Sequence, residues 1–144
     1  MIRPITEADI PGLRALYVRS NDSVGLPLPE GYFENDGRLF VSKTIREAQT
    51  LVSIEENRIA GVVCFTEDFL EALFVEPGFF GRGIGSALLK RAIDGKKSLR
   101  LNVYRDNERA VRFYLRHAFR ITSGGVNTEN RLPYLEMEWS EETK

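Results

Sequence analysis

Residues 75–86 have the sequence VEPGFFGRGIGS, and they join an apolar segment, 69–75, to a run with helical periodicity, 84–94. In that run Ile84, Ala87, Leu88 and Ala92 fall on one side of a helix. Glycines at 81, 83 and 85 allow backbone conformations that other residues avoid, and the first N–H groups of a helix have no intrahelical partners. The segment therefore predicts a strand, a glycine turn and a helix start that can bind an anion such as a diphosphate. The alternative is an ordinary tight turn with close helix packing.

Two known phosphate-binding loops do not fit these residues. A Walker A loop requires Gly-Lys-Ser or Gly-Lys-Thr, whereas Gly85 is followed by Ser86 and Ala87. The dinucleotide fingerprint G-x-G-x-x-G also fails, because position 86 is Ser and no βαβ unit opens the chain. Arg82 adds a positive charge beside the turn, so the turn favours an anion and requires no metal.

The segments on either side of this turn predict an α/β fold. Residues 2–4 can form a strand, and Thr6 or Asp9 can cap a first helix. Glycines and prolines in 21–37 predict a long loop with a short helical turn near Tyr32 and Phe33. The other predicted elements are a helix over 40–48, a hairpin of strands 50–54 and 58–65, the strand 69–75, the helix 84–94, the strand 99–104, the helix 107–117 and strands near 119–123 and 133–139. We expect one mixed sheet with helices against it.

Length and composition limit the class of protein. The 144 residues are 42% hydrophobic and 28% charged, which predicts one folded domain over 1–144. No apolar run approaches the roughly 20 residues of a membrane helix, and no export signal follows Met1, so we expect a cytoplasmic protein without membrane contact. Cys64 is the only cysteine and His117 the only histidine. An internal disulfide is excluded, and neither a zinc cluster nor a Ser-His-Asp triad is expected.

Charge is distributed unevenly along the chain. Residues 82–120 hold eleven Lys or Arg and three acidic residues, a net charge of +8, whereas the rest of the chain has a net charge of −9. This asymmetry favours a polyanionic ligand in one part and a cation in the other, although basic helix surfaces also serve solubility. A nucleic acid is the rival anion. The pI near 5.9 and the lack of a zinc-finger or RNA-binding signature argue against it.

The glycine turn resembles motif A of the GNAT N-acetyltransferase superfamily, Q/R-x-x-G-x-G/A. Gly83 and Gly85 occupy the two glycine positions, and Phe80 replaces the usual Gln or Arg. Residues 107–119, NERAVRFYLRHAF, resemble the second signature of the family, N-x-x-A-x-x-F-Y-x-x-x-G-F, with Ala118 in place of Gly. The start at residues 2–4 and the hairpin before 59–62 are also similar, so nearly the whole chain resembles a small, single-domain, bacterial-type member.

This resemblance implies a fold and a cofactor. The expected fold is a mostly antiparallel sheet of about six or seven strands, with one splayed strand pair and about four helices. The expected cofactor is acetyl-CoA, with its pantetheine arm along the main chain of the strand 69–75 and an N–H near Val75 polarising the thioester carbonyl. Asn107 holds the arm from the other side, or caps a helix, or does both. The residues that the resemblance assigns to the cofactor are Leu73, Val75, Phe80, Gly81, Arg82, Gly83, Ile84, Gly85, Ser86 and Asn107.

Two residues are candidates for catalysis. The resemblance places the Tyr114 hydroxyl beside the departing sulfur, and the alternative is a tyrosine packed in the core. A lysine-like amine with a pKa of about 10.4 needs roughly 4.6 kcal/mol to lose its proton at pH 7, so a base is required. Strand alternation places Glu71 on the same face as Leu73 and Val75, which makes it the candidate base. The alternatives are a solvated Glu71, or Glu67 or Asp68 as the base.

The sequence thus predicts an N-acetyltransferase that moves acetyl from acetyl-CoA to a primary amine, of a small molecule or a protein, by direct attack in a ternary complex. One alternative is an acyl-CoA-binding or regulatory module without turnover, and another is a nucleic-acid-binding domain. The acceptor is expected between loop 21–37 and segment 124–133, near Tyr32, Phe33, Tyr134 and Glu136. We expect no metal and no nucleic-acid partner, and a homodimer is compatible with the resemblance.

Overall fold

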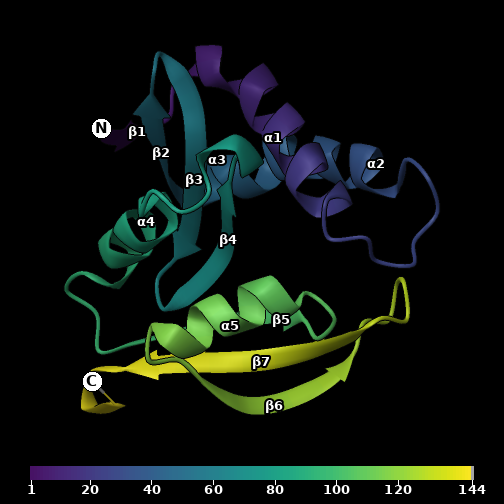
Figure 1. The fold of residues 1–144 in the computed structure, drawn as a ribbon, viewed down its shortest axis with the longest axis vertical. Coiled ribbons are helices and arrows are strands. Elements are labelled where there is room, and N and C mark those ends of the chain that lie inside the picture. Colours follow the sequence, from purple (N-terminus) through teal and green to yellow (C-terminus); the bar gives the residue numbers. More distant parts are fainter. Residues whose placement is uncertain (144) are drawn as a thin grey trace.

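A computed structural model describes residues 1–143 and shows one seven-stranded sheet with the strand order β1-β2-β3-β4-β5-β7-β6 (Figure 1). All neighbouring strands are antiparallel except β4 and β5, which are parallel. The strands are β1 (Ile2–Pro4), β2 (Gln49–Glu55), β3 (Arg58–Thr66), β4 (Phe69–Val75), β5 (Ser98–Tyr104), β6 (Arg120–Val126) and β7 (Pro133–Ser140). The expected mixed, mostly antiparallel sheet is confirmed. No helix within the described residues is long and apolar enough to cross a membrane.

Within residues 1–143 there are four helices of eight or more residues. They are α1 (Ile10–Asp22), α2 (Tyr32–Leu39), α4 (Ile84–Ile93) and α5 (Glu108–Arg116), and a π-helical turn over Phe40–Thr44 leads into the short α3 (Ile45–Glu47). α1, α4 and α5 pack on this sheet, and α2 packs against α1 and the π-helical turn. The helical turn predicted near Tyr32 and Phe33 is confirmed as the start of α2, but the helix is longer than predicted and replaces the loop expected up to residue 37. Gly37, taken as a loop residue, lies inside α2: a Cβ there would lie 3.3 Å from Cδ1 of Tyr17 in α1. Close packing of two helices explains this glycine.

The sheet is covered by apolar side chains on both faces. One core joins α1, the π-helical turn and α3 to β2, β3 and β4, and its buried residues include Leu13, Leu16, Phe40, Val62 and Cys64. The other core joins α4 and α5 to the opposite face, and its buried residues include Val63, Leu88, Leu99, Tyr114 and Trp139. β3 is buried on both faces, as its nearly continuous apolar sequence requires.

β4 and β5 separate soon after they meet. They pair only at Phe69 with Arg100 and at Leu70 with Leu101. The Glu76 N–H donates to the Ala60 oxygen of β3 at 2.8 Å, and backbone groups alternate along a strand, so those of Val75 and Leu73 point to the opposite edge of β4. That edge faces β5 beyond the last pair. The splayed strand pair expected from the resemblance is confirmed, and Leu73 and Val75 lie on its open edge.

Glu71 lies at a β-bulge, which the alternation argument did not anticipate. Cys64 pairs with Ala72 and the next residue, Phe65, pairs with Leu70, so Glu71 is the additional residue of β4. As a result Leu70 and Ala72 belong to the cores on opposite faces. The regular alternation on which the predicted common face of Glu71, Leu73 and Val75 was based is therefore interrupted at Glu71.

Candidate active site

Two cavities meet at the splayed strands. The first, of about 390 Å³, lies beside the start of α4 and is called here the glycine-turn cavity. The second, of about 670 Å³, lies between α1, α2, β4, β5 and the loop before β7, and is called here the acidic cavity. Five residues line both cavities and form a shared wall: Leu73, Phe74, Asn107, Ala110 and Tyr114. A molecule bound in one cavity can therefore contact a molecule bound in the other.

The glycine turn exposes its backbone to the first cavity. Gly81 and Gly83 have φ values of +80° and +79°, a region that disfavours other residues, and a Cβ at either position would meet no atom within 4 Å. The Ala87 N–H makes the first helical bond, to the Gly83 oxygen, which leaves the N–H groups of residues 84–86 without partners inside the helix. α4 thus begins with several donors at the cavity wall, as an anion site requires.

Four residues form the close contact between α4 and α5: Gly85, Ser86, Phe113 and His117. A Cβ at Gly85 would lie 3.3 Å from the Phe113 ring, so this glycine allows α5 to approach the turn. Ser86, on the first turn of α4, reaches the side chain of His117 across this contact: Ser86 Oγ lies 2.8 Å from His117 Nε2. His117 Nδ1 lies 2.7 Å from the Phe113 carbonyl oxygen. Sequence reasoning assigned no role to His117, and the helical spacing of 113 and 117 was its only signal.

The positive charge of the glycine-turn cavity comes from α5. Arg82 does not line the cavity: its guanidinium lies 4.7 Å from the centre of the Phe79 ring, and Nη1 donates to Glu56 Oε2 at 3.2 Å. Arg109 and Arg116 line it instead, and no acidic residue does so within the described chain. The Arg109 guanidinium lies 3.6 Å from the centre of the Phe80 ring. It brings a cation to the position where the family pattern has Gln or Arg. The shared helical face of 109, 113 and 116 was the signal in the sequence.

The remaining residues assigned to the cofactor lie together around this cavity. Leu73, Val75, Phe80, Gly81, Gly83, Ile84, Gly85, Ser86 and Asn107 line it. The Asn107 side-chain oxygen accepts the Ala110 N–H at 3.3 Å, so Asn107 is the N-cap of α5. Within residues 1–143 its amide NH2 donates no hydrogen bond, and the residue borders both cavities, so the cap and a ligand contact are compatible.

Tyr114 belongs to the shared wall. Its side chain packs edge-on against Phe113 and Phe119, and the residue is only 7% exposed. Burial raises the pKa of the phenol above its ordinary value. Tyr114 is therefore neutral near pH 7 and carries a proton that it can donate at the boundary between the cavities.

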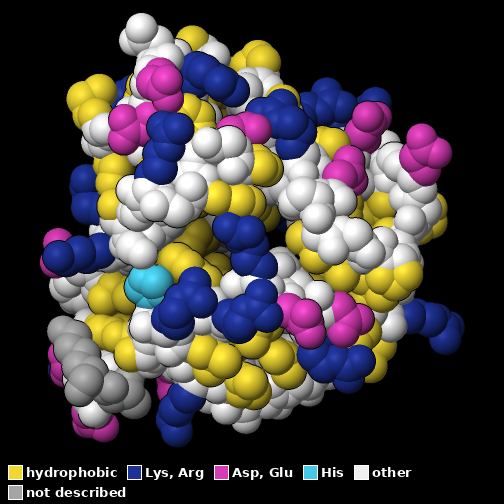
Figure 2. All heavy atoms as spheres, viewed as in Figure 1, with side chains coloured by type: hydrophobic (Ala, Val, Ile, Leu, Met, Phe, Trp, Pro, Cys, Tyr) yellow, Lys and Arg dark blue, Asp and Glu magenta, His cyan; other side chains and the backbone are white. Residues whose placement is uncertain are grey.

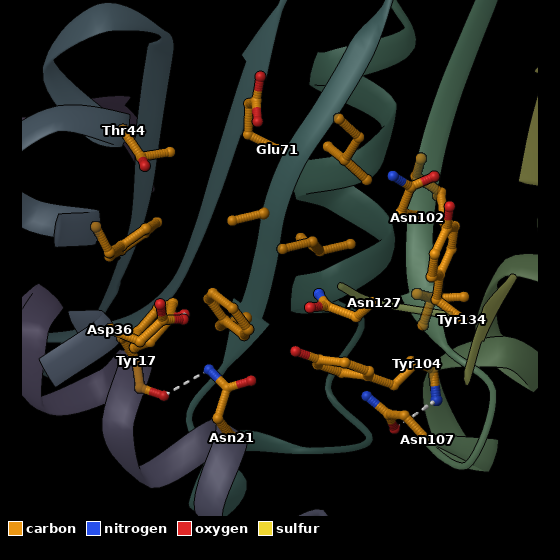
Figure 3. A pocket seen from close by; sticks show the side chains of 18 of the residues that line it. Tyr17, Asn21, Asp36, Thr44, Glu71, Asn102, Tyr104, Asn107, Asn127 and Tyr134 are labelled. Atoms are coloured by element: carbon orange, nitrogen blue, oxygen red, sulfur yellow. Dashed lines mark hydrogen bonds between the residues drawn. The ribbon is translucent and has the colours of Figure 1, made fainter. Parts of the chain in front are cut away.

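The acidic cavity is suited to a cation. Asp36, Glu71 and Glu129 line it, and no Lys or Arg does so within the described residues (Figure 3). Tyr17 donates a hydrogen bond to Asp36 Oδ2, and burial together with this bond raises the pKa of Tyr17. Figure 3 shows Asp36 and Tyr17 together on one wall, with Glu71 apart from them.

Not every residue expected near the acceptor borders this cavity. Tyr134 lines it. Tyr32 lies close by, since Asn130 Nδ2 donates to Tyr32 Oη at 3.1 Å and to Tyr104 Oη at 2.9 Å. Phe33 is buried in the core and Glu136 is outside the lining. Of the three acidic residues considered as bases, Glu71 lines the cavity, whereas Glu67 and Asp68 do not, and Asp68 pairs with Arg100 at 3.5 Å.

The comparisons with known proteins identify the class of this fold. The family model described as the acetyltransferase (GNAT) family matches residues 12–119. The chain therefore belongs to the GNAT family, and it is an N-acetyltransferase of a family that uses acetyl-CoA.

Several relatives of known name or structure resemble most of the chain. It is 31% identical over 141 residues, 96% of each chain, to the peptidyl-lysine N-acetyltransferase YiaC of Escherichia coli K12. It superimposes on the apo form of YjaB from Escherichia coli with a TM-score of 0.84, 27% identity and 96% coverage of each chain. The fold also matches a PaiA N-acetyltransferase from Thermoplasma acidophilum in complex with coenzyme A, with a TM-score of 0.77 and 19% identity over 97% of this chain and 98% of that chain.

Proposed function

We propose that this protein transfers acetyl from acetyl-CoA to the side-chain amine of a lysine in a peptide or protein. The diphosphate of acetyl-CoA binds the backbone N–H groups of the glycine turn, and the pantetheine arm pairs with the open edge of β4 at Leu73 and Val75. The thioester then lies at the shared wall. The lysine enters through the acidic cavity and meets the thioester beside Tyr114.

One observation carries this proposal: Tyr114 and Asn107 border both cavities, and the cavities have opposite charge. Arg109 and Arg116 suit the phosphates of a CoA thioester, and Asp36, Glu71 and Glu129 suit an ammonium group. If acetyl-CoA and the lysine meet at the shared wall, direct transfer in a ternary complex is favoured, because the amine is already close to the thioester. No covalent acetyl-enzyme intermediate is then needed.

The only cysteine is a poor candidate for such a relay. Cys64 has no exposed surface and lines neither cavity. Burial raises the pKa of its thiol to about 11, so it is protonated near pH 7. In direct transfer, the amine nitrogen forms the bond to the acetyl carbon, the carbon–sulfur bond breaks, and the Tyr114 hydroxyl donates to the departing sulfur.

The attacking amine must first lose a proton. Glu71 is exposed, lines the acidic cavity and has no ion-pair partner within residues 1–143, so it is available to accept this proton directly or through water. Removing a proton from a lysine-like amine at pH 7 costs roughly 4.6 kcal/mol, which is the free energy that the base offsets.

The lysine acceptor is supported by charge and by similarity. The relative YiaC is named as a peptidyl-lysine N-acetyltransferase. In this chain the half-buried Asp36 accepts one hydrogen bond from Tyr17 and has no Lys or Arg partner within the described residues. Asp36 is therefore the acidic side chain that we place against the positive charge of the acceptor as it enters.

The test measures acetyl-CoA binding by calorimetry and CoA thiol release over a panel of acceptors. The panel holds lysine peptides, the same peptides with the lysine side chain blocked, and peptides that offer only an α-amine. We expect release with free lysine side chains alone. Asp36→Asn is expected to raise KM for the peptide about tenfold while the Kd of acetyl-CoA stays within twofold.

Asp22→Asn is the matched control, because Asp22 is exposed at the end of α1 and lines neither cavity. Binding of acetyl-CoA without release on any acceptor would contradict the proposal and favour an acyl-CoA-binding module. Release with α-amines but not lysine side chains would replace the proposed acceptor.

A further inference from the structure

The Ser86–His117 pair is a part of the glycine-turn cavity that the transfer reaction itself does not use. The two side chains come from different helices and meet where the turn enters α4. Figure 2 shows the only histidine of the sequence, in cyan, at the rim of a hollow with basic side chains, in dark blue, next to it. Both residues line the cavity that we assign to the CoA diphosphate.

The contact with Phe113 fixes the tautomer of His117. The Phe113 carbonyl lies in the last turns of α5. There the backbone N–H of His117 donates to the backbone oxygen of Tyr114 and not to that of Phe113. A carbonyl oxygen can only accept, so Nδ1, at 2.7 Å, carries a proton and donates to it. In the neutral ring Nε2 then has no proton, and it accepts the hydroxyl proton of Ser86 at 2.8 Å.

With neutral His117, the Ser86 hydroxyl cannot donate a hydrogen bond to an anion in the cavity. The single hydroxyl proton is directed to His117, so Ser86 Oγ offers the cavity only lone pairs. The backbone N–H of the same residue is among the unpartnered donors of α4. A diphosphate at the turn would thus meet a favourable N–H and an unfavourable hydroxyl from one residue. Protonation of His117 removes the conflict.

We infer that His117 is a positioning residue for acetyl-CoA. The His117 imidazole takes up one proton from solvent as the diphosphate binds. In the imidazolium, Nδ1–H still donates to Phe113, and Nε2–H donates to Ser86 Oγ. The Ser86 hydroxyl proton is then free to donate to a phosphate oxygen. This inference rests on the proposed function, because it takes the diphosphate to lie at the glycine turn.

The surroundings of His117 couple its proton to the anion. His117 is the C-cap of α5, where the negative end of the helix dipole stabilises an imidazolium, and its ring lies 4.2 Å from the Phe113 ring. The other titratable or charged groups of the cavity are Arg109, Arg116 and Tyr114 from α5, and the walls from α1, β4, the turn and α4 add none within the described residues. The two arginines disfavour a third cation until a diphosphate offsets their charge.

The coupling has a definite sign. If binding raises the pKa of His117, binding is favoured below that pKa and weakens as the pH rises through it. For each unit by which the pKa of His117 is higher in the complex than in the free protein, the affinity for the diphosphate is expected to fall about tenfold from low to high pH. Binding of the diphosphate is therefore expected to be tighter at pH 6 than at pH 8.

The experiment uses acetyl-dephospho-CoA, which keeps the diphosphate and lacks the 3′-phosphate, whose own titration near pH 6 would interfere. Calorimetry in buffers of different ionisation enthalpy gives the protons taken up, and NMR of the single histidine gives its pKa with and without ligand. We expect uptake of up to one proton, a raised His117 pKa in the complex, and neither effect with S-acetylpantetheine, which has no diphosphate.

Two variants distinguish a role of His117 in binding the diphosphate from a role only in the stability of the fold. His117→Gln is expected to bind with the same affinity at pH 6 and pH 8, and Ser86→Ala to lose at least half of the proton uptake while its histidine still titrates. Ser123→Ala is the matched control, since Ser123 is exposed in β6 and lines neither cavity. It is expected to behave as the wild type.

Wild-type protein that binds acetyl-dephospho-CoA with no proton uptake and an unchanged His117 pKa would overturn the inference, as would full uptake in Ser86→Ala. These results would leave the proposed function intact. Absence of binding to acetyl-CoA itself at every pH would instead contradict the proposed function. The wild-type NMR titration is decisive even if a variant fails to fold.

Discussion

At the scale of single residues, the proposed chemistry depends on the proton of Tyr114. Burial keeps the phenol neutral, and Tyr114 lines both cavities. Tyr114→Phe removes the donor and keeps the ring, which packs against Phe113 and Phe119.

We expect Tyr114→Phe to lower kcat about 100-fold, the lower end of what general acid catalysis contributes, with the Kd of acetyl-CoA within twofold of wild type. Thiol release and calorimetry measure the two quantities. Turnover equal to wild type would remove Tyr114 from the mechanism, and a lowered melting temperature would show that the hydroxyl matters for folding instead.

Glu71 makes a second prediction at this scale. Glu71→Gln is expected to lower kcat/KM most at pH values below the pKa of the acceptor amine, where a proton must be removed, and least above it. The measurement is the pH profile of thiol release from pH 6.5 to 10.5. Glu67→Gln serves as the control, since Glu67 is exposed and lines neither cavity. A loss of the same size at every pH would count against Glu71 as the base.

At the scale of elements, the position of α4 on the sheet depends on a missing side chain in β3. A Cβ at Gly61 would lie 2.9 Å from Leu88 Cδ1 and 3.0 Å from the Phe74 oxygen. Leu88 can rotate, but the Phe74 carbonyl belongs to β4 and can move only with the strand. Phe74 also lines the glycine-turn cavity.

Gly61→Ala is therefore expected to lower the free energy of unfolding by about 1 to 3 kcal/mol, as other overpacked core sites do. Urea denaturation measures this change. Gly78→Ala is the control, because a Cβ there would meet nothing within 4 Å and its φ is not positive. A Gly61→Ala protein as stable as the wild type would show that β4 and α4 adjust without cost.

The helices and strands were largely predictable from sequence because their determinants are local. β4 occupies the predicted residues 69–75, and α4 follows the glycine turn as its periodicity indicated. The hairpin between β2 and β3 turns at Glu56 and Asn57, both with positive φ, which is typical of a two-residue turn. The boundaries of α2 were not predictable. Gly37 is needed for close packing against Tyr17, which lies twenty residues away in the chain.

The candidate site was predictable in its backbone and less so in its charges. Glycines and the Asn107 cap act within one turn of helix, so their places followed from sequence. Arg82 was predicted to line the cavity, but its guanidinium instead stacks on Phe79 and donates to Glu56. Glu56 lies in the turn between β2 and β3, far away in the sequence. The bulge at Glu71 depends on how β4 pairs with β3, which no local pattern records.

At the scale of the whole molecule, a partly buried ion pair connects Arg3 of the first strand to Asp9, the N-cap residue of α1. Asp9 accepts two hydrogen bonds from Arg3, at 2.8 and 3.0 Å, and one from the Thr6 N–H at 2.8 Å. Arg3 and these bonds lower the pKa of Asp9 to about 2. A carboxyl whose pKa is lowered by folding stabilises the protein above its unfolded pKa and loses that contribution as the pH falls through the folded value.

Asp9→Asn is expected to lower the free energy of unfolding at pH 7 by about 1 to 2 kcal/mol, a value that allows for partial solvent access to Arg3. The difference from wild type should shrink between about pH 4 and pH 2 and vanish below that range. Denaturation at a series of pH values measures it. Asp106→Asn, at an exposed pair with Arg105, is the control, and a pH-independent difference would contradict the account.

The separation of β4 from β5 also determines which amides exchange with solvent deuterium. Leu73 and Val75 lie in a strand at the centre of the sheet, where amide hydrogens ordinarily exchange slowly, yet their backbone groups face an edge without a pairing strand. Their amides should exchange far faster than that of Phe74 between them, and bound acetyl-CoA should slow them to the rate of their neighbours. On the proposed binding mode, the pantetheine arm would pair with the edge of β4 that β5 leaves open.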